Sequence, residues 1–169
     1  MRDMRQSRII VPEARYHITA KTHASRWVFE EPAACELFLK VIARAREKFH
    51  FRLENLCLMS NHVHMILQPA SGESLSGILQ WIFGVFAQTW NRIHGYVGGG
   101  PVWAQRFFSR VISSLRAYWH TFLYIDANPV VAGLVDRETP WAWARVSLLQ
   151  REPPFVLDPP PKEDLGFLD

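Results

Sequence analysis

The stretch 51–67 constrains the fold more than any other part of the sequence. It consists of two apolar runs, FRLENLCLM and HVHMIL, with only Ser60 and Asn61 between them. Serine and asparagine favour tight turns, so we expect the two runs to pair as an antiparallel hairpin. Side chains along a strand alternate between its two faces, which places His62 and His64 on the same face. The chain therefore has to fold around a strand that carries two imidazoles side by side.

Hydrophobic periodicity elsewhere in the chain predicts two more strands and three helices. Residues 15–22 alternate cleanly, with Tyr16, Ile18 and Ala20 on one face, as in a half-buried strand. The run 103–112 is the other expected strand. Apolar residues at helical spacing mark the expected helices, which are 31–50, 72–95 and 113–129.

The third helix has recognisable signals at both ends. Ser113 or Ser114 is expected to cap its start, and the helix is expected to stop before Pro129 because proline lacks the N–H that a helix needs. The elements then follow in the order strand, helix, strand, strand, helix, strand, helix. This order indicates an α+β fold, a ferredoxin-like sandwich with helices packed on an antiparallel sheet and the histidine strand at its centre.

Length and composition favour one domain followed by a tail. The chain has 169 residues, of which 49% are hydrophobic, so residues 1–150 are expected to form a single domain around one core. Residues 151–169 are rich in proline and acidic residues and are expected to be extended and flexible. Two basic and five acidic residues give this tail a net charge of −3, which leaves +6 for the body. A basic body favours a polyanionic partner.

Cysteine usage and the N-terminal sequence predict a cytoplasmic protein. Cys35 and Cys57 form no C-x-x-C pair and suggest no disulfide framework, which favours a reducing compartment. Residues 1–17 lack the apolar segment of a signal peptide, and no apolar run is long enough to span a bilayer. We therefore expect no membrane partner.

The two histidines of the apolar strand need polar partners, because a buried imidazole without one is costly. Ordinary hydrogen bonds are one way to satisfy them, and a metal ion is another. Structural zinc fits poorly, since no cysteine pair or third spaced histidine completes a tetrahedral set. Two imidazoles with one oxygen ligand would leave positions open for a substrate phosphate, an arrangement that suits Mg²⁺ or Mn²⁺.

The third helix offers an oxygen donor. Tyr124 and Asn128 are four residues apart and share one helical face, and His120 lies one turn earlier on that face. If this face docked on the histidine strand, a hydroxyl and an amide would lie over the two imidazoles. The alternative interpretation of Tyr124 is a core aromatic ring with a satisfied hydroxyl.

Five segments within residues 10–147 resemble, in order, the single-tyrosine HUH transposases, and most closely their REP-associated tyrosine transposase branch. The most specific are MSNHVHMIL, which carries the histidines, and LYIDANPVVAGLV about sixty residues later. The others are RYHITAKT, VWAQRFFSRVI and PWAWARVS. Two departures are visible: Ser60 replaces a proline that is usual in the family, and the segment after Pro129 lacks a common arginine.

The resemblance implies a role for each residue of the site. It makes His62 and His64 the metal ligands and Tyr124 the nucleophile. It makes Asn128 a third ligand through its side-chain oxygen, and it implies Mg²⁺ or Mn²⁺ as the cofactor. Two further histidines, which we expect to support a ligand or to contact a phosphate, are His17 and His120.

The activity implied by the resemblance is that of a metal-dependent single-stranded DNA endonuclease and strand transferase. Such an enzyme would cut hairpin or repeat DNA through a 5′-phosphotyrosine intermediate, as a monomer or homodimer associated with the nucleoid. A domesticated hairpin-binding protein that no longer cuts is the main alternative, and the intact histidines and Tyr124 speak against it. A replication initiator or relaxase is a weaker alternative, because those proteins usually have larger domains and often a second tyrosine.

Basic and aromatic side chains are candidates for contacts with DNA. The candidates for the phosphate backbone are Arg15, Lys21, Arg26, Arg106, Arg110 and Arg116. The candidates for base stacking are Trp27, Trp103 and Phe108. Solvated surface charge is the alternative for each basic residue, and core packing is the alternative for each aromatic residue.

Overall fold

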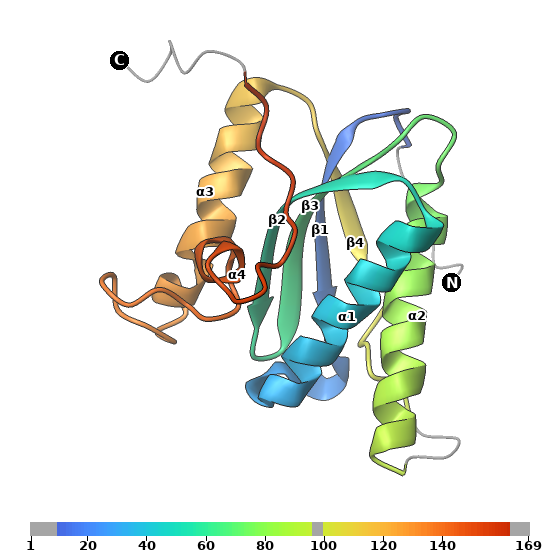
Figure 1. Cartoon of the computed structure of the whole chain (residues 1–169), viewed down its shortest axis with the longest axis vertical. Coiled ribbons are helices and arrows are strands. Elements are labelled where there is room, and N and C mark those ends of the chain that lie inside the picture. Colours follow the sequence, from blue (N-terminus) through green and yellow to red (C-terminus); the bar gives the residue numbers. More distant parts are fainter. Residues whose placement is uncertain (1–9, 96–99, 163–169) are drawn as a thin grey trace, which may run out of the picture.

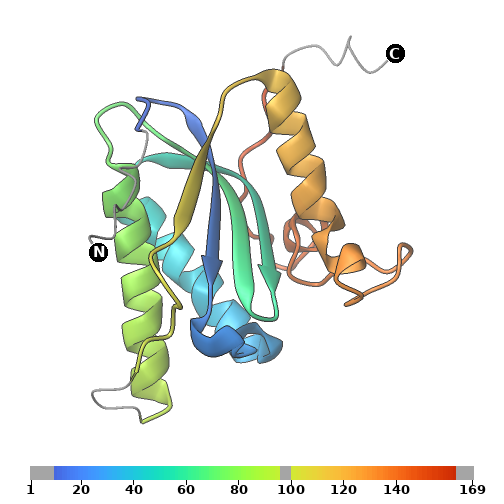
Figure 2. The same cartoon turned by 180° about the vertical axis from the view of Figure 1, so that it is seen from behind.

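The computed structural model describes residues 10–95 and 100–162, and its centre is a four-stranded antiparallel sheet (Figure 1, Figure 2). The strands are β1 (Arg15–Lys21), β2 (Phe51–Met59), β3 (His62–Pro69) and β4 (Phe108–Ile112). Their order in the sheet is β2-β3-β1-β4, so β3 and β1 are central. One helix connects β1 to β2 and another connects β3 to β4. This is the ferredoxin-like arrangement, and the predicted fold class is confirmed.

Two helices cover one face of the sheet, α1 (Pro32–Lys48) and α2 (Leu75–Ile93) (Figure 1). Their apolar sides pack with the β1 side chains of Tyr16, Ile18 and Ala20 in the larger of two hydrophobic cores. All three side chains are at most 4% exposed. The alternation that predicted a half-buried first strand is therefore confirmed, because the other β1 side chains point to the opposite face.

The third helix, α3 (Leu115–Val131), packs on that opposite face beside β2 (Figure 2). The hydroxyl of Ser114 caps it by accepting a hydrogen bond from the Ala117 N–H at 3.1 Å. Its buried side chains, which include Phe122 and Ile125, form a second, smaller core with Ile66 of β3 and two residues of β2. The sheet thus lies between two layers of helices.

The prediction that this helix stops before Pro129 is wrong, because α3 runs through Pro129 to Val131. The proline lies in the last turn, where it removes a single helical hydrogen bond. The carbonyls of that turn find partners beyond the helix: the Leu134 N–H donates to Pro129 O at 2.9 Å, and the Gly133 N–H donates to Val130 O at 3.0 Å. Gly133 has a positive φ of 72°, so the segment forms a Schellman C-cap.

The last strand was predicted over 103–112 and is shorter in the structure. Only Phe108–Ile112 pair with β1, and Trp103 makes an isolated bridge with Thr22. The indole N–H of Trp103 donates to the carbonyl of Phe83 in α2 at 2.9 Å. The segment before β4 runs along α2 (Figure 2), and this hydrogen bond anchors it there.

Two short 3₁₀ helices follow β1, η1 (His23–Ser25) and η2 (Val28–Glu30), and the last helix is α4 (Arg145–Leu149). Around α4, the C-terminal segment lies along the outer edge of β2 (Figure 1). The Leu58 N–H of β2 donates to the carbonyl of Trp143 at 3.0 Å. The edge of β2 is therefore covered by the same chain.

The tail is held against the body as far as the structure describes it. The carboxylate of Asp158 accepts hydrogen bonds from the Leu53 N–H and from the Arg46 guanidinium, both at 2.8 Å. The Asp158 N–H in turn donates to Leu53 O at 2.8 Å, and Leu157 is 8% exposed. Residues 151–162 form no helix or strand, and Asp158 holds this segment to an arginine of α1 and to the edge of β2.

Candidate active site

The two histidines of β3 lie side by side on the face that α3 shares. The register pairs Lys21 of β1 with His62 and Thr19 with His64. The two imidazole centroids are 4.8 Å apart with nearly perpendicular rings. His62 is half-buried and His64 is 4% exposed. The structure therefore presents two imidazoles together, as strand alternation requires.

Neighbouring side chains fix which nitrogen of each ring is available. The side-chain oxygen of Asn61 lies 2.8 Å from His62 Nδ1, so this nitrogen donates and Nε2 keeps its lone pair. On the other ring, His64 Nδ1 lies 3.0 Å from His17 Nε2 and 3.3 Å from the Thr19 hydroxyl. His64 Nε2 is then the nitrogen that remains for a ligand, since its partner nitrogen is engaged by β1.

All three histidines are held neutral at pH 7. Burial, with help from the Arg110 charge, lowers the pKa of His17 to about 4. Burial and the neighbouring Lys21 also lower the pKa of His62. Burial, the two other imidazoles and Lys21 lower the pKa of His64 to about 3. Neutral imidazoles keep the lone pair that a metal ion requires.

Tyr124 of α3 lies over these rings. Its ring centroid is 5.7 Å from that of His64 and 6.0 Å from that of His17, and both contacts are edge-to-face. The side chain is 54% exposed, so the alternative of a buried core aromatic does not hold. The structure therefore brings together His62, His64 and Tyr124 within one chain, and His17 joins them.

Two other predicted residues, Asn128 and His120, are not among the residues that line the cavity around the histidines. The Asn128 amide donates a hydrogen bond to the Tyr124 carbonyl at 3.3 Å. Four residues of helix place Asn128 about 6 Å further along α3 than Tyr124. His120 is exposed, one turn before Tyr124. Sharing a helical face was not enough to bring either side chain into the cavity.

A cavity of about 700 Å³ joins these groups. It is lined by His17, Thr19, Lys21, Ser25, Asn61, His62, His64, Ala104, Gln105, Arg106, Phe108 and Tyr124. Its lining includes two cationic side chains, Lys21 and Arg106, and no carboxylate. The lining of this cavity is therefore cationic, and it favours a ligand that carries negative charge.

The donor set fits a divalent cation that shares its coordination with a substrate. Two neutral imidazoles are available, through the Nε2 atoms of His62 and His64. Among the described residues, no group of three histidine, cysteine, aspartate or glutamate side chains could hold a metal ion. A closed structural zinc site is therefore not formed by this part of the chain, and an ion here would complete its shell with oxygens of substrate and water.

A β-bulge in β2 lies against α3, and it was not predicted from the sequence. The register with β3 shifts between Leu53 and Asn55, so Glu54 is an extra residue of the strand. Glu54 and Asn55 consequently both face α3, and both are fully buried. The signal was present, since an acid and an amide stand in the middle of the apolar run FRLENLCLM.

Each of these buried groups has a partner. The Asn55 amide donates to the carboxylate of Asp126 on α3 at 3.0 Å. The Glu54 carboxylate accepts from Arg15 at 2.9 Å and from Arg52 at 3.1 Å. Burial raises the pKa of Asp126, which lies two residues after Tyr124. These contacts tie the tyrosine helix to the strand next to the histidines.

The predicted DNA-contacting residues divide into several environments. Lys21, Arg106 and Phe108 line the cavity, and Phe108 is 64% exposed. Arg110 is exposed and pairs in register with His17.

Three arginines lie elsewhere: Arg15 is bound to Glu54, Arg26 donates to the Pro101 carbonyl, and Arg116 is exposed in the first turn of α3. Of the other aromatic candidates, Trp27 is exposed and Trp103 packs against Phe83.

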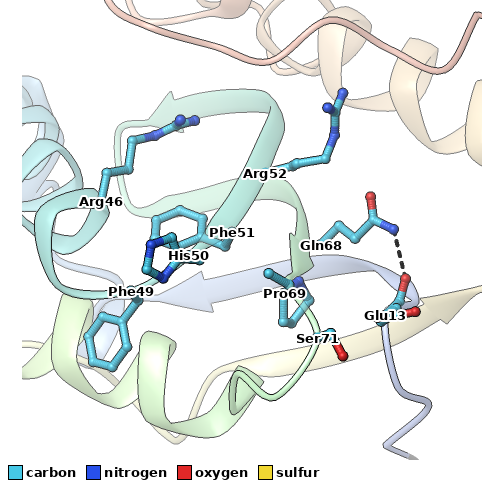
Figure 3. Close-up of a pocket in the computed structure, with 10 residues that line it drawn as sticks. Glu13, Arg46, Phe49, His50, Phe51, Arg52, Gln68, Pro69 and Ser71 are labelled. Atoms are coloured by element: carbon cyan, nitrogen blue, oxygen red, sulfur yellow. Dashed lines mark hydrogen bonds between the residues drawn. The ribbon is translucent and has the colours of Figure 1, made fainter.

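A second cavity, of about 440 Å³, lies at the opposite end of β3, around Pro69 (Figure 3). Its two arginines are already paired, Arg46 with Asp158 and Arg52 with Glu54. This cavity therefore offers little uncompensated charge.

None of the described helices combines the length and apolar character that a bilayer crossing requires.

A family model and two solved structures are similar to this chain. A family model described as "Transposase IS200 like" matches residues 10–128. The structure of a REP-associated tyrosine transposase bound to a REP hairpin is similar, with 19% identity, 90% of this chain and 87% of that chain covered, and a TM-score of 0.74. A putative transposase from Deinococcus radiodurans R1 gives 16% identity, 71% and 95% coverage, and a TM-score of 0.48. No curated protein sequence matches significantly.

Proposed function

Since this chain belongs to the family of IS200-like transposases, we propose that it is a metal-dependent endonuclease and strand transferase acting on single-stranded or hairpin DNA. The observation that carries the proposal is the position of Tyr124, whose exposed ring faces His64 and His17 in the cavity that His62 also lines. A tyrosine hydroxyl, two available imidazole nitrogens and cationic walls are what phosphodiester cleavage through a protein nucleophile needs.

In the proposed reaction, the Tyr124 oxygen attacks the phosphorus of a DNA phosphodiester. A bond forms between this oxygen and phosphorus, the bond from phosphorus to the 3′-oxygen breaks, and the tyrosine proton ends on the released 3′-hydroxyl. The 5′-phosphate stays linked to Tyr124. Attack by another 3′-hydroxyl reverses the step and joins new strands, so no external energy source is required.

The remaining residues of the cavity have supporting roles in this proposal. His62 and His64 would hold Mg²⁺ or Mn²⁺, which supplies neutralisation of charge on the non-bridging phosphate oxygens. Asn128 remains the candidate for a third ligand. His17 holds the His64 ring in orientation through its 3.0 Å contact. Lys21 and Arg106 would contact neighbouring phosphates.

DNA hairpins are the proposed substrate, and palindromic repeats near the gene are the expected source. The structurally similar REP-associated transposase is bound to a REP hairpin. On this chain, exposed Phe108 and Arg110 extend the cavity along β4, where an unpaired strand would have both an aromatic surface and a cation. We propose that the protein acts in the cytoplasm on nucleoid DNA, as a monomer or homodimer.

A hairpin-binding protein without cleavage activity is the second candidate, and one observation favours it. Among the described residues, no group of three histidine, cysteine, aspartate or glutamate side chains could hold a metal ion, and Asn128 is not in the lining of the cavity. The two candidates differ in a denaturing gel of labelled hairpin DNA incubated with the protein and Mn²⁺. If the chain cleaves DNA, the denaturing gel shows a covalent protein–DNA band that a chelator abolishes. If the chain only binds DNA, a shifted band appears on a native gel alone.

A further inference from the structure

A small apolar cavity of about 150 Å³ lies between α2 and the segment that precedes β4. It is lined by Ala20, Gln80, Phe83, Trp103, Gln105, Arg106 and Phe107. Three of these side chains, Ala20, Phe83 and Phe107, are buried and form its apolar part. The polar side chains Gln80, Gln105 and Arg106 are exposed and surround it.

The walls of this cavity are held in place. The Trp103 indole is fixed by its 2.9 Å hydrogen bond to the Phe83 carbonyl, and the two rings are 4.8 Å apart in an edge-to-face contact. The rings of Phe83 and Phe107 are stacked 5.9 Å apart. The Ala104 N–H donates to the Lys21 carbonyl at 2.9 Å, which anchors the segment to β1. The cavity is thus formed before anything binds.

This small cavity adjoins the candidate active site. Gln105 and Arg106 line both cavities. Ala20 lines the small cavity, whereas the next residue, Lys21, lines the active-site cavity, because consecutive strand residues point to opposite faces. The segment 104–106 therefore forms a lip between the histidine face of the sheet and the small cavity.

We propose that this cavity binds a single unpaired pyrimidine base of the DNA whose phosphate lies at Tyr124, an inference that rests on the proposed function. An apolar cavity of about 150 Å³ accommodates one six-membered aromatic ring, as benzene shows in an engineered protein cavity, and a fused purine is larger. The amides of Gln80 and Gln105 can each donate and accept, which matches the polar edge of a pyrimidine. Arg106, on the lip, would hold the phosphate of that nucleotide.

The probe for this proposal is a fluorescent DNA hairpin with short oligo(dT) tails, bound to the full chain. At one tail position, replacing the thymidine by an abasic nucleotide or by deoxyadenosine is expected to weaken binding about tenfold, the order expected for one stacked base. In the Gln105→Ala and Gln80→Ala variants, the same replacements in the DNA are expected to weaken binding much less than in the wild type. Gln88→Ala, an exposed glutamine two turns further along α2, is the matched control and should behave like the wild type.

The outcomes separate this proposal from the proposed function. If the wild type tolerates an abasic nucleotide at every tail position while it still forms the covalent adduct, the base site is wrong and the activity stands. If deoxyadenosine binds as well as thymidine at the sensitive position, the assignment to a pyrimidine is wrong. If the chain binds no DNA at all, both are overturned.

Discussion

The two faces of the sheet use the same strands for different purposes. Toward α1 and α2, β1 presents Tyr16, Ile18 and Ala20 to a closed apolar core. Toward α3, the same strand presents His17 and Thr19, which line an open cavity. Alternation along one strand thus separates the residues that stabilise the fold from those that carry the chemistry. A strand can hold several polar side chains on one face because its other face supplies the hydrophobic stabilisation.

The largest expected loss of stability comes from the closed face. Phe38 of α1 is fully buried among aromatic rings, so Phe38→Ala should lower the free energy of unfolding by about 3–5 kcal/mol, because it leaves a cavity. Chemical denaturation of the purified chain measures this directly. A loss below about 1 kcal/mol would show that this face does not dominate stability.

Removing the tail should have the next largest effect. A chain that ends at Arg151 loses the Asp158 hydrogen bonds to Leu53 and Arg46 and the burial of Leu157. We expect a decrease of about 2–4 kcal/mol in unfolding free energy. A chain that ends at Lys162 retains these contacts and is the control. Equal stability of the two truncated chains would contradict the docked tail.

The link between β2 and α3 should matter less for stability and more for cleavage. Asn55→Ala leaves the half-buried Asp126 carboxylate without its 3.0 Å partner, at a cost of about 1–3 kcal/mol. It should also slow adduct formation while Mn²⁺ affinity is retained, because Tyr124 loses its support. The exchanged pair, Asn55→Asp with Asp126→Asn, keeps one donor and one acceptor and should restore the rate. No rescue by the exchange would argue against this positioning.

On the open face, a substitution should change metal binding with a smaller effect on stability. His64→Ala removes a side chain that is 4% exposed and contacts His17 and Thr19, so the unfolding free energy should fall by about 1–2 kcal/mol, less than for Phe38→Ala. Mn²⁺ binding, followed by calorimetry or by the EPR signal of the free ion, should decrease strongly. A stability loss as large as that of Phe38→Ala would remove the distinction between the faces.

The smallest expected effect is a pH dependence that comes from the same face. The pKa values of His17 and His64 are lowered to about 4 and about 3 in the folded chain, below the ordinary histidine value. Below about pH 6.5 the unfolded chain therefore binds more protons than the folded chain. The free energy of unfolding decreases as the pH is lowered, until the pH reaches the pKa values of the folded chain. Between pH 7 and 6 each of these two histidines should contribute about 0.7 kcal/mol to the loss, and one of the two contributions should be absent in His17→Gln. Stability that rises on acidification through this range would contradict the neutral cluster.

Local patterns predicted the hairpin, the pair of histidines on one face and the order of elements. They did not predict what depends on contacts between distant segments. The helix end at Pro129 was misjudged because the Schellman cap uses Gly133 and Leu134, which lie beyond the helix. The approach of His17 to His64 requires the β1–β3 register, since 47 residues separate them.

The position of Tyr124 likewise depends on long-range packing. Helical spacing placed Tyr124, Asn128 and His120 on one face, but only Tyr124 reaches the cavity. Asn55, next to the bulge at Glu54, binds Asp126 of α3, and the turn that carries Tyr124 lies beside the histidines. Spacing within one element predicts which residues can act together, and packing decides which of them do.

The most direct test of Tyr124 as the nucleophile removes one oxygen atom from its side chain. Tyr124→Phe should bind labelled hairpin DNA and Mn²⁺ as the wild type does but form no covalent adduct on a denaturing gel. Tyr118→Phe is the matched control on the same helix, because burial and the neighbouring Glu54 raise the pKa of Tyr118 and its ring lies in the smaller core. An adduct is expected with Tyr118→Phe and none with Tyr124→Phe. An adduct that persists in Tyr124→Phe, or that forms undiminished in chelator, would contradict the proposed metal-dependent reaction of Tyr124.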